Sequence, residues 1–356
     1  ASRKIYVALS ELPGEIMSDF DAILLTSFGG PEKSDDVRPF LENVASGRNI
    51  PPERLAQVQE QYDLYGGVSP INQQNRELIT ALQAELHTNG IDIPVYFGNR
   101  NWAPYIKETL DDLYADGKKN ILALVTSAFG SYSGCRQYRE DIAKALAQIN
   151  AKDLYVEKVR LYWNHPGFFE AMCDRLSSTL DSIDLENAGQ VQIIFTAHSI
   201  PSSWEMSSPY RSQLLEFSQS LSTAVAPDLA WDLVFQSRSG PPSVPWLEPD
   251  IIDHLDALKT SGADCVVITP IGFVSDHMEV MYDLDNQAIS HADKLGMESR
   301  RTPTVGTHPA FVRGLRQLIE EYLEARSPLV AFGEPWVCNP NCCPPTQQRP
   351  PSRPDR

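Results

Sequence analysis

Short apolar runs rich in β-branched residues alternate along this chain with longer stretches in which apolar residues recur at helical spacing. The apolar runs occupy residues 22–26, 94–97, 121–126, 154–161, 191–195, 233–236 and 265–270. The helical spacing occurs at residues 52–61, 75–87, 105–115, 138–149, 166–182, 210–225, 249–261 and 280–295. Such alternation is typical of βαβ units. It predicts an α/β fold of doubly wound parallel sheets with helices on both faces.

The length of 356 residues suits two domains. Residues 122–129 and 266–273 resemble one another, because each is an expected strand that runs into a loop of small residues. We therefore predict two similar Rossmann-like domains, residues 20–155 and 156–326, facing a central cleft. Residues 1–19 are interpreted as an N-terminal extension outside the fold. Residues 327–356 form a Cys- and Pro-rich tail, and its last dozen residues are expected to be disordered.

The composition excludes several classes of function. A formal charge of -17 argues against non-specific binding of nucleic acid, and a charge of this sign mainly favours solubility. No apolar run approaches the ~20 residues of a membrane span, and the N-terminus lacks the apolar core of a secretory signal. We expect a cytoplasmic protein.

His198 directly follows one apolar run, in the segment Phe-Thr-Ala-His-Ser-Ile-Pro. An isolated histidine at such a place is more often a strand-end residue bonded to backbone. However, loops at the carboxyl ends of parallel strands also hold functional side chains. Both interpretations stay open from this segment alone.

A second strand-end segment, residues 270–285, gathers five ionisable side chains: Asp276, His277, Glu279, Asp283 and Asp285. If a helix begins near His277, Glu279 and Asp283 are i,i+4 neighbours on one face. Capping of the helix accounts for Asp276 but not for the other three carboxylates. Oxygen ligands beside an imidazole suit divalent cations. We therefore hypothesise that this line of carboxylates passes a hydrated metal ion inward.

The segments at His198 and at residues 275–279 closely resemble the two signature motifs of ferrochelatases. Residues 24–32, 61–71, 236–241 and 245–249 resemble further family segments, in family order. On this basis the chain is identified as a member of the family, with the matches running from about residue 20 to residue 325. The resemblance implies a lyase-type metal chelatase of heme biosynthesis. Its substrates are a porphyrin and Fe²⁺, and no redox cofactor takes part in catalysis.

The resemblance also implies roles for individual residues. His198 would accept protons from the pyrrole nitrogens or contact the metal, and Glu279 would face it across the cleft. Asp283 and Asp285 would continue the acidic line as metal ligands. Substrate-binding candidates, which offer apolar walls, polar groups or basic groups, are Phe28, Arg48, Tyr65, Ser69, Arg100 and Trp246. Phe28 departs from relatives with Tyr or Met there, and it cannot ligate a metal.

The substrate is predicted from residues 41–50, which are polar in this chain. In the family branch that associates with membranes and uses protoporphyrin, the corresponding segment is an apolar lip. The polarity of residues 41–50 favours coproporphyrin III, converted to coproheme, with a downstream heme-pathway enzyme as a possible partner. Protoporphyrin IX, a cobaltochelatase and a non-catalytic heme-binding protein stay open as alternatives. A dinucleotide enzyme does not fit, because no G-x-G-x-x-G follows the first expected strand.

Three cysteines crowd into the tail, Cys338, Cys342 and Cys343, and Cys135 lies in a loop after a strand. Four thiolates can hold a [2Fe–2S] cluster. The arrangement resembles that of cluster-containing ferrochelatases, closest to the actinobacterial coproporphyrin enzymes, and implies a structural or regulatory cluster. Free thiols or a structural zinc site of the same ligand type remain alternatives.

Overall fold

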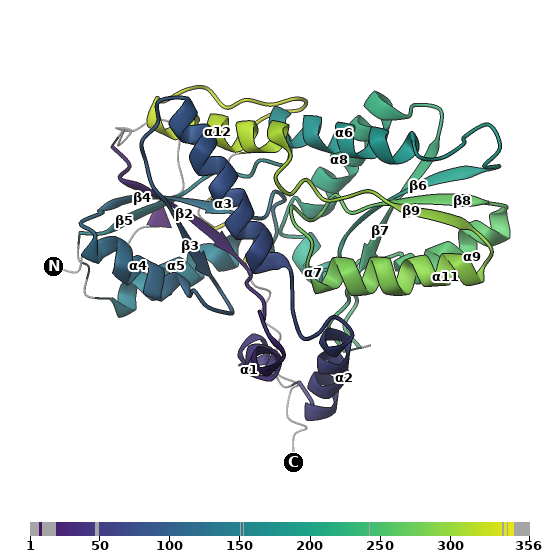
Figure 1. Ribbon diagram of the computed structural model, residues 1–356, viewed down its shortest axis with the longest axis horizontal. Coiled ribbons are helices and arrows are strands. Elements are labelled where there is room, and N and C mark those ends of the chain that lie inside the picture. Colours follow the sequence, from purple (N-terminus) through teal and green to yellow (C-terminus); the bar gives the residue numbers. More distant parts are fainter. Residues whose placement is uncertain are drawn as a thin grey trace, which may run out of the picture.

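The computed structural model describes residues 7–8, 19–46, 50–149, 151, 153–241, 243–336, 338–339 and 341–344. They form two parallel β-sheets, each with helices on both faces (Figure 1). The first sheet has the order β1-β5-β4-β2-β3 and the second β7-β6-β8-β9. The first comprises β1 (Val7–Ala8), β2 (Ala22–Ser27), β3 (Val95–Asn99), β4 (Asn120–Val125) and β5 (Tyr155–Lys158). The second comprises β6 (Val191–His198), β7 (Ala230–Gln236), β8 (Cys265–Thr269) and β9 (Glu298–Arg301). The predicted fold class is confirmed.

The central strands β2 and β6 are apolar and buried on both faces, as expected when helices cover both sides of a parallel sheet. In β2, Ala22 and Leu24 pack under α4 (Ile106–Ala115) and α5 (Gln137–Gln148). Ile23 and Leu25 point the other way, towards α3 (Ile71–Thr88). In β6, Ile194 lies in the smaller core with α9 (Ile251–Ser261) and α11 (Ile289–Lys294).

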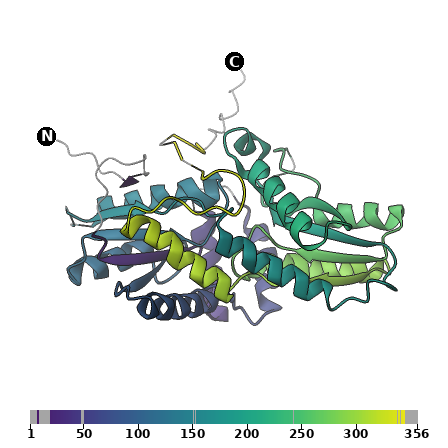
Figure 2. The same ribbon diagram turned by 90° about the horizontal axis from the view of Figure 1, so that it is seen from above.

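The two sheets share one large hydrophobic core. It joins residues of β2, β4 and α3 to residues of β6, β8, α6 (Pro166–Leu180) and α8 (Tyr210–Val225). The last helix, α12 (Pro309–Leu323), contacts both α6 and α3, and it lies over the first half and meets α6 at the border with the second half (Figure 2). The predicted boundaries assign α12 to the second domain, but it is packed on both.

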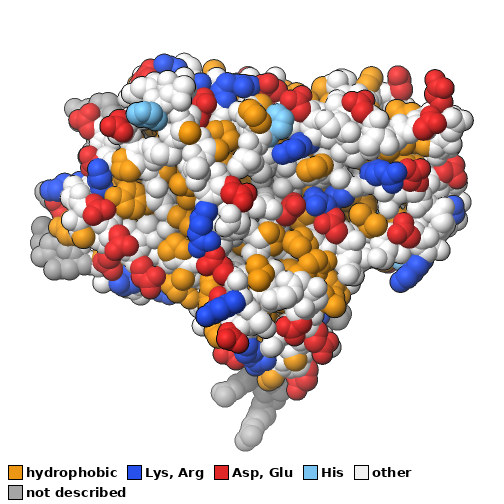
Figure 3. Space-filling view, in the orientation of Figure 1, with side chains coloured by type: hydrophobic (Ala, Val, Ile, Leu, Met, Phe, Trp, Pro, Cys, Tyr) orange, Lys and Arg blue, Asp and Glu red, His pale blue; other side chains and the backbone are white. Residues whose placement is uncertain are grey.

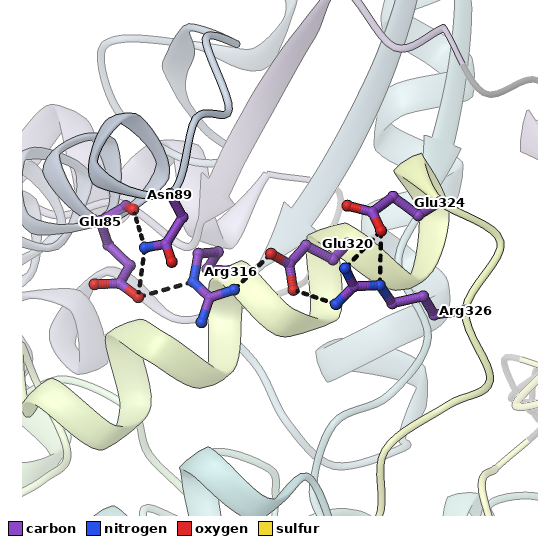
Figure 4. A network of polar contacts seen from close by, with 6 residues as sticks. All are labelled: Glu85, Asn89, Arg316, Glu320, Glu324 and Arg326. Carbon is purple, nitrogen blue, oxygen red and sulfur yellow. Dashed lines mark hydrogen bonds and ion pairs between the residues drawn. The ribbon is translucent and has the colours of Figure 1, made fainter.

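Ion pairs fasten α12 to α3 (Figure 4). Arg316 Nε lies 2.8 Å from a carboxylate oxygen of Glu85 on α3, and Arg316 also contacts Glu320 one turn further along α12. Arg326 reaches the other oxygen of Glu320 at 3.0 Å. Glu320 is buried and binds both guanidinium groups, so its charge is compensated.

The two halves have corresponding topologies. The strand orders β3-β2-β4-β5 and β7-β6-β8-β9 match position by position. After β4 the chain forms a π-helix, η1 (Tyr132–Arg136), and then α5; after β8 it forms α10 (Met278–Val280), the π-helix η2 (Met281–Ala288) and then α11. The duplication that residues 122–129 and 266–273 indicate is therefore present in the fold. π-Helical turns are rare and frequently mark functional sites.

The two ends of the chain add to this frame. Val7 and Ala8, in the expected N-terminal extension, pair with β5, so contrary to expectation these two residues belong to the first sheet. The tail runs back over the link between the domains, where Asn164 binds the backbone of Ala331, Phe332 and Glu334. The dozen residues expected to be disordered, 345–356, lie outside the described residues. Within the described residues, no helix is long and apolar enough to cross a membrane.

Candidate active site

His198 is the last residue of β6, and its backbone and ring are both held in place. The Tyr210 hydroxyl donates to the His198 carbonyl at 3.0 Å, and His198 Nδ1 lies 2.5 Å from the Ser199 carbonyl oxygen. The bond to backbone expected of a strand-end histidine is therefore present. The other ring nitrogen, Nε2, lies 3.3 Å from a carboxylate oxygen of Glu279. His198 is thus held by backbone contacts on one side, and its Nε2 is directed to a carboxylate on the other.

Glu279 reaches His198 from the short helix α10, which lies between β8 and η2. His277 caps this helix, because its Nδ1 accepts the backbone N–H of Glu279 at 3.2 Å. Burial lowers the pKa of His277, which keeps the ring neutral and able to accept that bond. Gln236, at the end of β7, donates to the Glu279 carbonyl. The Glu279 side chain remains 43% exposed, so the pair with His198 is open on one side.

The charges of His198 and Glu279 depend on each other. Burial opposes protonation of His198, but the Glu279 carboxylate outweighs it and raises the pKa of His198 to about 9. Burial likewise disfavours a charge on Glu279, yet the imidazolium holds the Glu279 pKa at about 2. At neutral pH the two groups form an imidazolium–carboxylate pair.

Asp283 lies one turn beyond Glu279, beside Ser237, whose hydroxyl donates to its carboxylate. Burial raises the pKa of Asp283 to about 7, against the hydrogen bond from Ser237 and together with the negative charge of Glu279. Near neutral pH this carboxyl group therefore exists in both protonation states.

Asp285 points away from this group. It binds Arg301 at the end of β9, and Arg301 also lies 3.3 Å from Asp276. The expected line of acids therefore divides, with Glu279 and Asp283 near His198 and Asp285 in a separate ion pair. The physical reason is helical geometry, since residues two apart on a helix do not share a face.

The expected porphyrin-contacting residues occupy varied surroundings. Phe28, after β2, is 40% exposed and packs edge-on against Phe40. The Tyr65 hydroxyl donates to the carbonyl of Met281 on η2 at 2.9 Å. Ser69 is buried, and Trp246 is half-buried in a loop that pairs with Pro201.

The two arginines expected at the substrate site differ in what the structure shows. Arg100 is 6% exposed, pairs with Asp141 at 2.6 Å and stacks over the ring of Tyr138. Its charge is thus already matched, which suits a supporting position better than direct capture of a propionate. Arg48 lies outside the described residues.

Two helices of the first half, α1 (Ser34–Ala45) and α2 (Pro52–Asp63), project beneath the sheets and form a lip. Hydrophobic side chains gather where this lip meets the second half (Figure 3). Val37, Phe40 and Tyr62 of the lip form one apolar cluster with Met278 of α10. An open cavity of about 380 Å³ lies there, lined by Arg54, Gln57, Glu60, Gln61, Leu64 and Tyr282.

Sequence reasoning missed several residues of this site. Tyr62 and Tyr210 both have a pKa raised by burial and by the nearby negative charge of Glu279, although they are far apart in sequence. Gln236 and Ser237 belong to residues 236–241, a segment that resembles the family but did not indicate any part in the site. The one available signal was that this segment directly follows an apolar run, as His198 does.

The four predicted cluster cysteines come together. Cys338 hydrogen-bonds with Cys135 of η1 and with Cys342, and Cys342 hydrogen-bonds with Cys343. These bonds lower the pKa of Cys135 and Cys342, against burial, and raise the pKa of their partners Cys338 and Cys343. None of the six cysteines forms a disulfide. Among the described residues, no group of three or more His, Cys, Asp or Glu side chains is arranged to hold a single metal ion.

The sequence profile of the ferrochelatase family matches residues 20–323. The chain belongs to the ferrochelatase family. It is 49% identical to a ferrochelatase of Rhodopirellula baltica, over 96% of this chain and 97% of the relative. It is 50% identical to a coproporphyrin III ferrochelatase of Streptomyces coelicolor, over 85% and 86% of the two chains. Among solved structures, SirB from Bacillus subtilis with Fe³⁺ has a TM-score of 0.52 and 12% identity, covering 86% of this chain and 96% of SirB, a likeness of fold alone.

Proposed function

We propose that this ferrochelatase inserts Fe²⁺ into coproporphyrin III, with His198 and Glu279 as the catalytic pair. The observation that carries the proposal is the imidazolium–carboxylate contact, 3.3 Å long, between His198 at the end of β6 and Glu279 on α10. The pair is partly open to solvent, and Val37, Phe40 and Tyr62 form an apolar cluster with Met278, the neighbour of Glu279 on α10. An apolar wall suits the face of a macrocycle, whereas the charged pair suits its nitrogens and the metal.

Insertion requires two pyrrole N–H protons to leave as Fe²⁺ enters. In the proposed sequence, Glu279 and Asp283 attract the hydrated cation, and its positive charge displaces the proton of His198 to solvent. The neutral Nε2 of His198 then accepts the first pyrrole proton. The Asp283 carboxylate takes the second, since its pKa of about 7 suits transfer at neutral pH. Two protons leave for each divalent cation, so charge is conserved.

The macrocycle would lie against Phe28, Tyr65 and Trp246, near Ser69. The choice of coproporphyrin III is supported by the names of two relatives, from Streptomyces coelicolor and Streptomyces griseus, which are 50% and 45% identical to this chain. The open cavity supports it too, because Arg54, Gln57 and Gln61 offer hydrogen-bond donors for carboxylates at the edge of the site. A substrate with four propionates has more use for such donors than one with two.

The experiment compares anaerobic insertion of Fe²⁺ into coproporphyrin III and protoporphyrin IX, followed by loss of porphyrin fluorescence. We expect coproporphyrin III to give the higher kcat/KM. A preference for protoporphyrin IX would reject the substrate assignment while keeping the enzyme a ferrochelatase. Tight heme binding without metallation of either porphyrin would favour the non-catalytic alternative.

We also propose that Cys135, Cys338, Cys342 and Cys343 hold a [2Fe–2S] cluster. The donor set fits, because four thiols form one hydrogen-bonded group in which the pKa is lowered at Cys135 and Cys342 and raised at their partners. Positive charge compensates Cys135 and Cys342, since buried Lys158 favours the Cys135 thiolate and Arg139 Nη1 lies 3.8 Å from Cys342 Sγ. When bound, the cluster would cross-link the tail to η1 and supply a one-electron centre outside catalysis.

Analysis of iron and acid-labile sulfide, with electron paramagnetic resonance after reduction, tests the cluster. Two iron atoms and two sulfides per chain are expected, and Cys135→Ser should lose them. Cys173→Ser is the matched control, because Cys173 lies on α6, outside the group of four. Zinc in place of iron and sulfide would contradict the proposal. We also propose that the enzyme works in the cytoplasm, where disulfides are rare, and passes its product to a later heme-pathway enzyme.

A further inference from the structure

The turn after β7 carries a backbone conformation that is unusual for its residue. Ser237 has a φ of 61°, and among the described non-glycine residues only Ala325 and Cys343 share a positive φ. This left-handed region is unfavourable for residues other than Gly, Asn and Asp. A serine held there needs compensation from its surroundings.

The compensation lies in what this turn contacts. Consecutive side chains of an extended strand point to opposite faces. The left-handed turn at Ser237 instead lets two consecutive side chains reach the same element: Gln236 donates to the Glu279 carbonyl, and Ser237 Oγ donates to the Asp283 carboxylate. The Gln236 carbonyl also accepts the N–H of Ser199 at 2.8 Å, next to His198. Two residues thus connect the histidine loop with the Glu279 backbone and the Asp283 carboxylate.

The segment that carries Glu279 and Asp283 needs such external support. Glu279 lies in an α-helix of only three residues, and Asp283 lies in the π-helix that follows. π-Helical turns are rare and occur frequently at functional sites, which draws attention to what holds this segment in place. Gln236 is buried, so its hydrogen bond to the Glu279 carbonyl restrains the segment.

We infer that Ser237 is a positioning residue for iron capture: its hydroxyl orients the Asp283 carboxylate, and its left-handed backbone is kept for that purpose. This inference rests on the proposed function of Asp283. Ser237 binds one carboxylate oxygen of Asp283, and in this proposal the other oxygen binds the cation. The hydroxyl therefore matters for Fe²⁺ and not for the porphyrin, which lies against other side chains.

Two substitutions separate the hydroxyl from the backbone. Ser237→Ala removes the hydroxyl and keeps a Cβ in the left-handed conformation, whereas Ser237→Gly removes both the hydroxyl and the conformational penalty. We expect both variants to raise the KM for Fe²⁺ about tenfold, the effect of losing a hydrogen bond to a charged group. The KM for coproporphyrin III should stay unchanged. Ser237→Gly should nevertheless unfold at a higher temperature than Ser237→Ala.

Ala325→Gly is the matched control, because Ala325 has a φ of 52° but lies exposed beyond α12. It should relieve the same conformational penalty with no change in either KM. An unchanged KM for Fe²⁺ in both Ser237 variants, or an equal rise in both KM values, would overturn the inference while the wild type still inserts iron. A wild type that inserts no iron would instead overturn the proposed function. Anaerobic equilibrium binding of Fe²⁺ without porphyrin gives a second readout, in which the Ser237 variants should bind about tenfold more weakly.

Discussion

Replacing Glu279 by Gln keeps the shape of the side chain but removes the charge that sustains the His198 imidazolium. In the wild type that carboxylate raises the pKa of His198 from the ordinary 6.5 to about 9, against burial. At about 1.4 kcal/mol per pKa unit, this is a coupling of about 3 kcal/mol. Because Glu279 is 43% exposed, solvent screening reduces the coupling to about 1–2 kcal/mol. The His198 pKa should therefore fall by about 0.7–1.5 units in Glu279→Gln.

The sign of the pH dependence follows from the direction of these pKa changes. The folded-state pKa of His198 is raised, so the stability that the pair contributes is present below pH 6.5 and is lost as the pH rises towards about 9. The Glu279 pKa is depressed from 4.5 to about 2, so acid removes the same contribution between those values. The wild type should lose about 1–2 kcal/mol relative to Glu279→Gln between pH 6.5 and pH 9.

An NMR titration of the histidine ring protons, with His198 assigned by substitution, measures this pKa directly. Urea unfolding at pH 6.5 and pH 9 measures the stability change. A His198 midpoint that is equal in wild type and Glu279→Gln would refute the claim that the two side chains form a charged pair. A midpoint near 6.5 in both proteins would show that Glu279 is turned away from the ring.

Three further outcomes test other parts of the structure. Asp285→Asn should lower the melting temperature but leave the KM for Fe²⁺ near the wild-type value, because Asp285 is paired with Arg301; an increase as large as that of Asp283→Asn would contradict this. Arg316→Met leaves the buried Glu320 with a single partner, and it should lower the free energy of unfolding in urea by about 3 kcal/mol. Arg326→Ala removes an exposed guanidinium, and it should lower this free energy by less than about 1 kcal/mol. Equal effects would show that the pairing of α12 with α3 contributes little. Cys135→Ser should lower the thermal midpoint under anaerobic conditions through release of the tail, and an unchanged midpoint would show that the tail is held without the thiols.

Much of the fold could be predicted from the sequence, because a strand that is buried on both faces is a continuous run of apolar residues. The runs at residues 22–26 and 191–195 correspond to β2 and β6, which are interior strands of their sheets. Binary patterning does not reveal helix type, and so the π-helix over Met281–Ala288 could not be predicted. Patterning also does not show which elements of the two halves touch, and for that reason α12 was assigned to one domain only.

The site was predictable where local order fixes it. His198 and Glu279 each follow a buried strand, and parallel strands place such residues at one edge of the sheet. The direction of Asp285 depends on its ion pair with Arg301, and the place of Arg100 depends on its ion pair with Asp141. Both partners come from other elements. Ser237 was hidden for another reason, since a left-handed conformation at a serine has no sequence signature.

The most direct test of the central claim is the single-turnover rate of anaerobic Fe²⁺ insertion into coproporphyrin III by wild type, His198→Ala and His254→Ala. His254 is a matched control, because it also contacts a carboxylate, Asp232 at 3.1 Å, but lies outside the site. The account predicts at least a hundredfold loss of rate for His198→Ala, with porphyrin binding kept, and a wild-type rate for His254→Ala. Equal rates in all three proteins would show that the His198–Glu279 pair is not the insertion centre.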